Sequence, residues 1–241
     1  MTSNRREFLK NVLTIGANLW VGPYAAGALM AHTDDASSLR DRVAQEAERI
    51  IASVRHTKYQ HDAYIDVATG TYDVDCSEYV SYVLGLVSKR HLALIPKEPS
   101  YPVPRAYKYC EYFRALRENA PGEGWQRIQH LTQTRRGDII AWALPGGPQK
   151  DRDTGHVFVA DTPSRVSEQI VSVPVFDSST VKHYDDSRLH SDGGFHDGVG
   201  RGTIHFRVDA AGRPIAFQFG RGDHFHDDPI AIGRIKPLIQ G

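Results

Sequence analysis

Apolar residues recur at helical spacing in three stretches of the first half of the chain. Residues 38–54, 76–87 and 105–118 each place apolar side chains three or four positions apart, which predicts three amphipathic helices. A polar loop over residues 56–72 separates the first two helices, and a proline-rich loop around residues 96–104 precedes the third. We therefore expect the first half to be helical.

The second half of the chain changes to short segments typical of β-strands. They are rich in β-branched and aromatic residues, and Gly, Pro, Asp and Ser lie between them. The predicted strands are residues 125–131, 138–143, 156–161, 169–176, 203–208, 214–219 and 230–235. Residues 209–212 predict a hairpin turn, and residues 144–154 and 183–202 predict surface loops. Helices followed by strands predict an α+β domain with an antiparallel sheet.

The N-terminus has the pattern of an export signal. Two adjacent arginines, at positions 5 and 6, precede a mildly apolar stretch and a run of small residues. The paired arginines resemble the twin-arginine signal of bacteria. We expect residues 1–31 to be the signal, with cleavage near Ala28 or Ala31, and residues 32–241 to form a single domain in the periplasm or at the cell surface. The alternative is an ordinary cationic amphipathic N-terminus.

Charge and composition narrow the classes of partner. Lys+Arg and Asp+Glu both number 29, so the formal net charge is zero, which argues against a nucleic-acid partner. No apolar run reaches the roughly 18 residues that a spanning helix needs, so we expect no stable membrane span after signal cleavage. The chain has no Gly-rich phosphate loop and no Cys-x-x-Cys motif, and we expect no cofactor.

Cys76 is the candidate nucleophile. It opens the predicted helix over residues 76–87, where the helix dipole and the first-turn N–H groups favour a thiolate and can hold an oxyanion. We expect these effects to lower its pKa below the ordinary value of about 8.5. A small buried apolar residue is the other interpretation of Cys76. Cys110 lies on the apolar stripe of its helix and is predicted to be core, although a Cys76–Cys110 disulfide remains an alternative.

His156 and Asp177 are the candidate partners of the thiol. His156 begins one predicted strand, and Asp177 follows the end of the next. If the strands pair in the register that sets His156 opposite Asp177, the carboxylate can orient the imidazole toward the thiol. A shift of one residue would put the two side chains on opposite faces of the sheet. Taken singly, each has a structural interpretation, as a strand histidine and a turn aspartate.

Three short motifs resemble those of one family. The motifs are Asp75-Cys76-Ser77, Arg136-Gly137-Asp138 leading into a strand, and Gly155-His156-Val157. Together they resemble the NlpC-type cell-wall cysteine peptidases, which belong to the papain-like superfamily with the cysteine- and histidine-dependent amidohydrolases/peptidases (CHAP). The resemblance covers roughly residues 59–177. It implies a papain-like core, with Cys76 as the nucleophile, His156 as the base and Asp177 at the third catalytic position.

The resemblance also implies supporting residues and an activity. Family members often have an upstream tyrosine near the thiol, which implies Tyr59, with Tyr64 and Tyr72 as alternatives. Tyr59 and Ser77 are the expected oxyanion or support residues. The implied activity is that of an exported hydrolase that cleaves an amide bond of a peptide or peptidoglycan fragment through an acyl-enzyme. The same core also supports acyl transfer to an amine.

Some features depart from the family pattern. Glu78 replaces the usual glycine after Cys-Ser, no wall-binding repeat is present, and a long segment follows Asp177. That segment is rich in metal-ligating residue types: His183, Asp185, Asp186, His190, Asp192, His196, Asp197, His224, His226, Asp227 and Asp228. The alternative function is therefore a non-enzymatic periplasmic scaffold or metal-binding protein that uses these loops.

Overall fold

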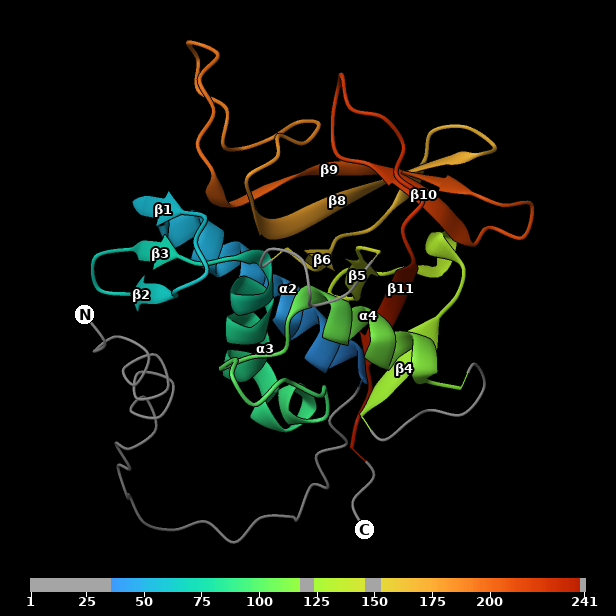
Figure 1. Ribbon diagram of the computed structural model, residues 1–241, viewed down its shortest axis with the longest axis horizontal. Helices are drawn as coiled ribbons and strands as arrows, with labels where there is room; N and C mark the ends of the chain where they lie inside the picture. The colour runs from blue at the N-terminus through green and yellow to red at the C-terminus, as the bar shows by residue number, and fades with distance from the viewer. Residues whose placement is uncertain (1–35, 118–123, 146–152, 239–241) are drawn as a thin grey trace, which may run out of the picture.

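Three helices of the described residues pack on one face of a sheet in the computed structural model (Figure 1). The structure describes residues 36–117, 124–145 and 153–238, so the expected signal, residues 1–31, lies outside it. The helices are α2 (Ala36–Ser53), α3 (Cys76–Ala93) and α4 (Ala106–Ala115). Within the described ranges, no helix is both long and apolar enough to cross a membrane.

An antiparallel sheet forms the second layer. Its strands are ordered β10-β9-β8-β6-β5-β11-β4, and a short β7 pairs with β8. The strands are β4 (Trp125–Ile128), β5 (Ile139–Ala143), β6 (Gly155–Ala160), β7 (Ser164–Arg165), β8 (Ile170–Ser179), β9 (Gly198–Val208), β10 (Pro214–Gln218) and β11 (Ile230–Ile235). The predicted α+β class, with N-terminal helices on an antiparallel sheet, is confirmed, and so is the hairpin turn between β9 and β10.

Two of the predicted loops contain strands. The polar loop over residues 56–72 includes β1 (His56–Lys58), β2 (Tyr64–Asp66) and the start of β3 (Thr71–Asp73), which form a separate small sheet. A strand of three residues is too short to show the alternation of apolar and polar residues from which strands are predicted. The loop prediction for residues 183–202 was also too long, because β9 begins at Gly198. Three glycines at alternate positions hide the apolar pattern of that strand.

Both faces of the main sheet are buried. Side chains alternate along a strand, so Val157 of β6 faces the helices while Phe158 faces the other side. The helix-side layer includes Val80, Val83, Tyr109, Phe113, Ile139, Ala141, Val157 and Val159. The opposite layer includes Ile140, Trp142, Phe158, Val173, Val175, Phe206 and Phe217. The connections that follow β8 and β10 lie on this second side (Figure 1), which gives the C-terminal segment a structural role.

The turn before β5 joins the sheet to α2. Gly137 adopts φ +85°, and a Cβ atom there would lie 2.0 Å from the backbone oxygen of Arg40. The neighbouring Asp138 is fully buried and accepts hydrogen bonds from the backbone N–H of Arg135 at 2.8 Å and from Nη2 of Arg234 at 2.7 Å. Glycine is therefore required at position 137 by both backbone conformation and close packing.

Gly137→Ala is expected to destabilise the protein more than Gly193→Ala does. Gly193 has nearly the same dihedral, φ +86°, but a Cβ atom there would meet nothing within 4 Å. Both variants bear the backbone cost of about 1–2 kcal/mol, and only Gly137→Ala adds overpacking of about 1–3 kcal/mol. Denaturant unfolding of both variants measures the difference, and equal losses would contradict this account of the turn.

Candidate active site

A capping box fixes the first turn of α3, where Cys76 lies. The Asp75 side chain accepts from the backbone N–H of Glu78 at 2.8 Å, and the Glu78 carboxylate accepts from the backbone N–H of Asp75 at 3.0 Å. These reciprocal bonds satisfy donors that a helix start otherwise leaves unpaired, and such a cap contributes about 1 kcal/mol. Glu78 thus helps to hold Cys76 in place.

The Cys76 thiol lies against the start of β6. Cys76 is only 3 % exposed. The hydroxyl groups of Tyr59 and Ser77 each lie 4.0 Å from its sulfur. The backbone N–H of Val157 acts on the thiol by lowering its pKa. Val157 and the candidate base His156 are neighbours on β6, and their side chains point to opposite faces of the sheet. Tyr59 and Ser77 occupy the positions beside the thiol that the sequence predicts.

The other two candidate tyrosines lie elsewhere. The Tyr72 hydroxyl is hydrogen-bonded to Ser53 at 3.0 Å within the core, and Tyr64 is exposed at the edge of the small sheet. Among the three candidates, Tyr59 is therefore the one hydrogen-bonded to Cys76.

The expected lowering of the Cys76 pKa is wrong. Burial raises the pKa of the thiol, and the adjacent Asp75 carboxylate raises it further. The hydrogen bonds from Val157, Ser77 and Tyr59 act in the opposite direction but do not offset the loss of solvation. The resting thiol is therefore protonated at neutral pH, and a thiolate forms only if a base accepts its proton.

His156 and Asp177 form the predicted pair. The Nε2 atom of His156 lies 2.7 Å from Oδ2 of Asp177, and both residues are buried. The register of β6 and β8, which sets Val159 opposite Phe176, differs by two residues from the one expected. A shift of two keeps both side chains on the same face, so the pair still forms.

The remaining nitrogen of His156, Nδ1, is left for another partner. The ring is held by Trp142 and Phe219, with centroids 5.2 Å and 5.8 Å away. Within the described part of the chain, no hydrogen bond joins this imidazole to the Cys76 sulfur. The ring therefore packs on the layer of the sheet opposite the helices, with Trp142 and Phe158, whereas Cys76 lies in the helix-side layer, so the structure does not bring the two side chains together.

Asp177 is clamped by two residues that the sequence analysis did not assign to the site. Its Oδ2 atom also bonds Nε2 of His183 at 2.7 Å, and its Oδ1 atom accepts from Nη1 of Arg188 at 3.1 Å. Asp186 accepts from Nε of Arg188 at 2.8 Å. Burial alone would raise the pKa of Asp177, but attraction to His183 and Arg188 and the hydrogen bonds from His156 and His183 hold it well below its usual range. The carboxylate stays ionised.

Two glycines of β9 make room for this clamp. A Cβ atom at Gly200 would lie 2.7 Å from Cγ of Arg188, and one at Gly202 would lie 2.6 Å from Cβ of His183. His183 lies in a predicted surface loop, but its side chain is fully buried. The alternating glycines of β9 could have indicated this packing, because glycine within a strand often marks the close approach of another group.

A cavity of about 200 Å³ opens at Cys76. Its lining includes the carboxylates Asp62, Asp75, Glu78 and Asp153, together with His61, Tyr59, Tyr101 and Arg105. Nδ1 of His61 lies 2.9 Å from Oδ2 of Asp75, so the cavity wall holds a second imidazole–carboxylate pair. His61 is therefore a competing candidate for the base.

Glu78 gives the cavity a pH-dependent charge. Burial raises its pKa to about 9, and the Asp75 carboxylate adds to the shift. In the unfolded chain Glu78 loses its proton near its ordinary pKa of about 4.3. Between that pH and about 9, the folded protein therefore binds the proton more tightly than the unfolded chain does. The proton stabilises the folded state at low pH, and this stabilisation is lost as the pH rises from about 4.3 to about 9.

Glu78→Gln is therefore expected to gain stability relative to the wild type between about pH 5 and about pH 8. The amide does not ionise and keeps an oxygen for the backbone N–H of Asp75. Urea unfolding of both proteins across this range measures the effect. A difference that stays constant with pH would contradict the raised pKa of Glu78.

The two cysteines are not paired. Both are free and buried, and Sγ of Cys110 donates to the backbone oxygen of Pro229 at 3.1 Å. Cys110 is fully buried among apolar residues of the helix-side core. The prediction that Cys110 is a core residue is confirmed, and the disulfide alternative is wrong.

The described residues contain two groups with the donor types and spacing of a metal site. One is His156, Asp177 and His183, whose ligand atoms lie within 4.8 Å of one another. Hydrogen bonds within this group and the Arg188 guanidinium already occupy its carboxylate, which disfavours a cation there. The other is Asp223, His224 and His226, near the surface.

The start of β6 thus has a protonated thiol and N–H donors of a helix start on one face of the sheet, and an imidazole held by an ionised carboxylate on the other. A thiol, a base and oxyanion donors are the groups that acyl transfer from an amide to sulfur requires. Its members come from α3, β6, β8 and the segment before β9 (Figure 1). Comparison of the chain with protein-family models, curated proteins and solved structures finds no match.

Proposed function

We propose that the protein is a cysteine hydrolase with a papain-like core that cleaves an amide bond. The observation that carries the proposal is the buried 2.7 Å bond between Nε2 of His156 and Asp177, together with the position of Cys76 at the start of α3 beside the Tyr59 hydroxyl. This pairing commits Nε2 to the carboxylate and leaves Nδ1 to take the thiol proton, which requires the imidazole to reach the helix side of β6. Asp177 orients the ring and stabilises the imidazolium without taking up the proton itself.

The reaction has two halves. In the first, Nδ1 of His156 takes the proton from Sγ, sulfur bonds to the carbonyl carbon, and the amine leaves with that proton as the C–N bond breaks. The oxyanion is held by N–H groups at the start of α3 with the Tyr59 hydroxyl. In the second, His156 takes a proton from water, and the resulting hydroxide releases the acid and restores the thiol.

The charge of the cavity bears on the substrate. Besides Glu78, whose raised pKa keeps it protonated at neutral pH, three carboxylates line the cavity against one guanidinium and one imidazole, so it favours a substrate portion that carries an ammonium group. Peptide fragments of peptidoglycan contain amino groups of this kind. Together with the export signal and the family resemblance, this favours a peptidoglycan peptide as the substrate in the periplasm or at the cell surface.

Incubation of the purified chain with peptidoglycan fragments tests the proposal. Mass spectrometry should show a new carboxyl and a new amine product, and Cys76→Ala should form neither. Addition of an excess of a small amine separates hydrolysis from transfer, because a transferase would yield the amide of that amine. Cleavage that persists in Cys76→Ala would overturn the proposal.

A further inference from the structure

A turn between β10 and β11 gathers three metal-ligating side chains outside the proposed active site. Oδ1 of Asp223 lies 3.1 Å from Nε2 of His226 and 3.5 Å from Nδ1 of His224. The ligand atoms of all three lie within 4.8 Å of one another. Two imidazoles and one carboxylate form a donor set that suits zinc.

Two of the three donors are held in place by the fold. His226 exchanges two backbone hydrogen bonds with Phe217, at 2.8 Å and 2.9 Å, and its ring stacks on the Phe217 ring at a centroid distance of 5.1 Å. The Asp223 carboxylate accepts from the backbone N–H of Phe219 at 3.1 Å and of His224 at 2.8 Å. His224 is largely exposed and can complete the set at little cost.

We propose that Asp223, His224 and His226 bind one Zn²⁺ ion, with water in the fourth position. Ligands about 2.0–2.1 Å from a tetrahedral ion are separated by roughly 3.3 Å, close to the two separations seen here. The ion replaces the hydrogen bond between Nε2 of His226 and Asp223, and that proton moves to Nδ1 of the same ring. The site needs neither Cys76 nor His156, so it stands apart from the hydrolase proposal.

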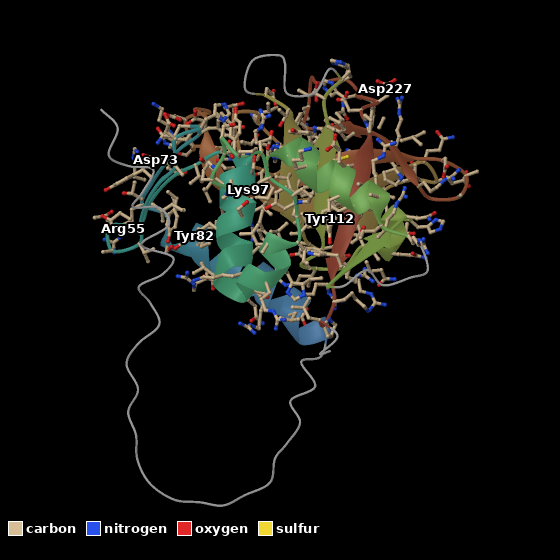
Figure 2. The ribbon with its side chains drawn as sticks, turned by 60° about the horizontal axis from the view of Figure 1, so that its bottom comes forward. Arg55, Asp73, Tyr82, Lys97, Tyr112 and Asp227 are labelled. Carbon is tan, nitrogen blue, oxygen red and sulfur yellow. The ribbon has the colours of Figure 1, made fainter. Side chains whose placement is uncertain are left out.

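The surroundings add negative charge to the site. Asp227 follows His226 directly and lies at the periphery of the molecule (Figure 2). Asp228 interacts electrostatically with His226 and with Asp153, and Asp153 lines the cavity at Cys76. A cation on this turn would therefore be attracted by carboxylates beyond its own ligands.

Calorimetric titration of the metal-free chain with ZnCl₂ tests the proposal. We expect one ion per chain with a micromolar dissociation constant, weakened at least roughly tenfold by His226→Ala or Asp223→Ala. The double variant His190→Ala/His196→Ala is the matched control, because it removes two exposed histidines whose rings lie 3.9 Å apart. It should bind zinc as the wild type does.

Three outcomes would overturn the zinc site. One is no binding by the wild type, and another is binding that survives His226→Ala. The third is binding lost in His183→Ala but kept in His226→Ala, which would place the ion at the buried Asp177 cluster. Co²⁺ gives a second readout, because a nitrogen and oxygen site shows visible bands without the ultraviolet charge transfer of a thiolate ligand.

Discussion

Replacing His156 with alanine is expected to lower kcat/KM for a cleaved peptide by about 10²–10⁴-fold. The structure makes this loss large because the Cys76 thiol is buried beside Asp75, and both effects raise its pKa. Without a base the sulfur stays protonated at neutral pH and is a poor nucleophile. Steady-state rates of the wild type and the variant on the same peptide measure the effect.

His61→Ala is the control for this prediction, because His61 also pairs with a carboxylate beside Cys76. We expect a much smaller loss, expressed mainly in KM, since His61 lines the cavity but is held by Asp75 at the helix cap. The reverse ranking of the two variants would contradict the account. In that case His61 would be the base, and the His156–Asp177 pair would be structural.

Arg188→Ala is expected to lower the free energy of unfolding by about 3–5 kcal/mol. Arg188 is the guanidinium that neutralises Asp177 and Asp186, which are both buried. Without Arg188, two buried carboxylates lose the guanidinium that neutralises them. The free-energy cost of burying these charges without it is far larger than the stabilisation that the ion pairs themselves provide. Urea unfolding monitored by circular dichroism measures the loss.

Arg213→Ala is the matched control for the clamp. Arg213 also bonds an aspartate, Asp209, at 2.7 Å, but this pair lies on the exposed β9–β10 hairpin. Exposed pairs contribute about 0–1 kcal/mol, so this variant should stay close to the wild type. Comparable losses in the two variants would show that the buried charges around Asp177 do not depend on Arg188.

The sequence predicts the elements of this fold well where apolar periodicity is long. In the part of the chain that the structure describes, the three helices and seven main strands all lie within the predicted stretches or overlap them. The His156–Asp177 pair was also predictable, because an even shift in register leaves the two side chains on the same face of the sheet and only an odd shift separates them. A shift of two, which is what occurs, preserves the contact.

The parts that the sequence did not predict depend on tertiary contacts. His183 and Arg188 lie in a polar stretch with no periodicity, and only their packing on Gly202 and Gly200 brings them to Asp177. The pKa of Cys76 was mispredicted because a helix start alone favours a thiolate, whereas burial against β6 opposes it. Neither effect can be judged before the elements are placed together.

The rate of Cys76 alkylation by iodoacetamide as a function of pH tests the central claim, the pairing of Cys76 with His156. Peptide mapping distinguishes Cys76 from the buried Cys110. In the wild type we expect an inflection at a lower pH than in His156→Ala, because His156 accepts the thiol proton as the sulfur reacts. In the variant the inflection should move to higher pH, because burial and Asp75 then act unopposed. Identical profiles in the two proteins would contradict the claim.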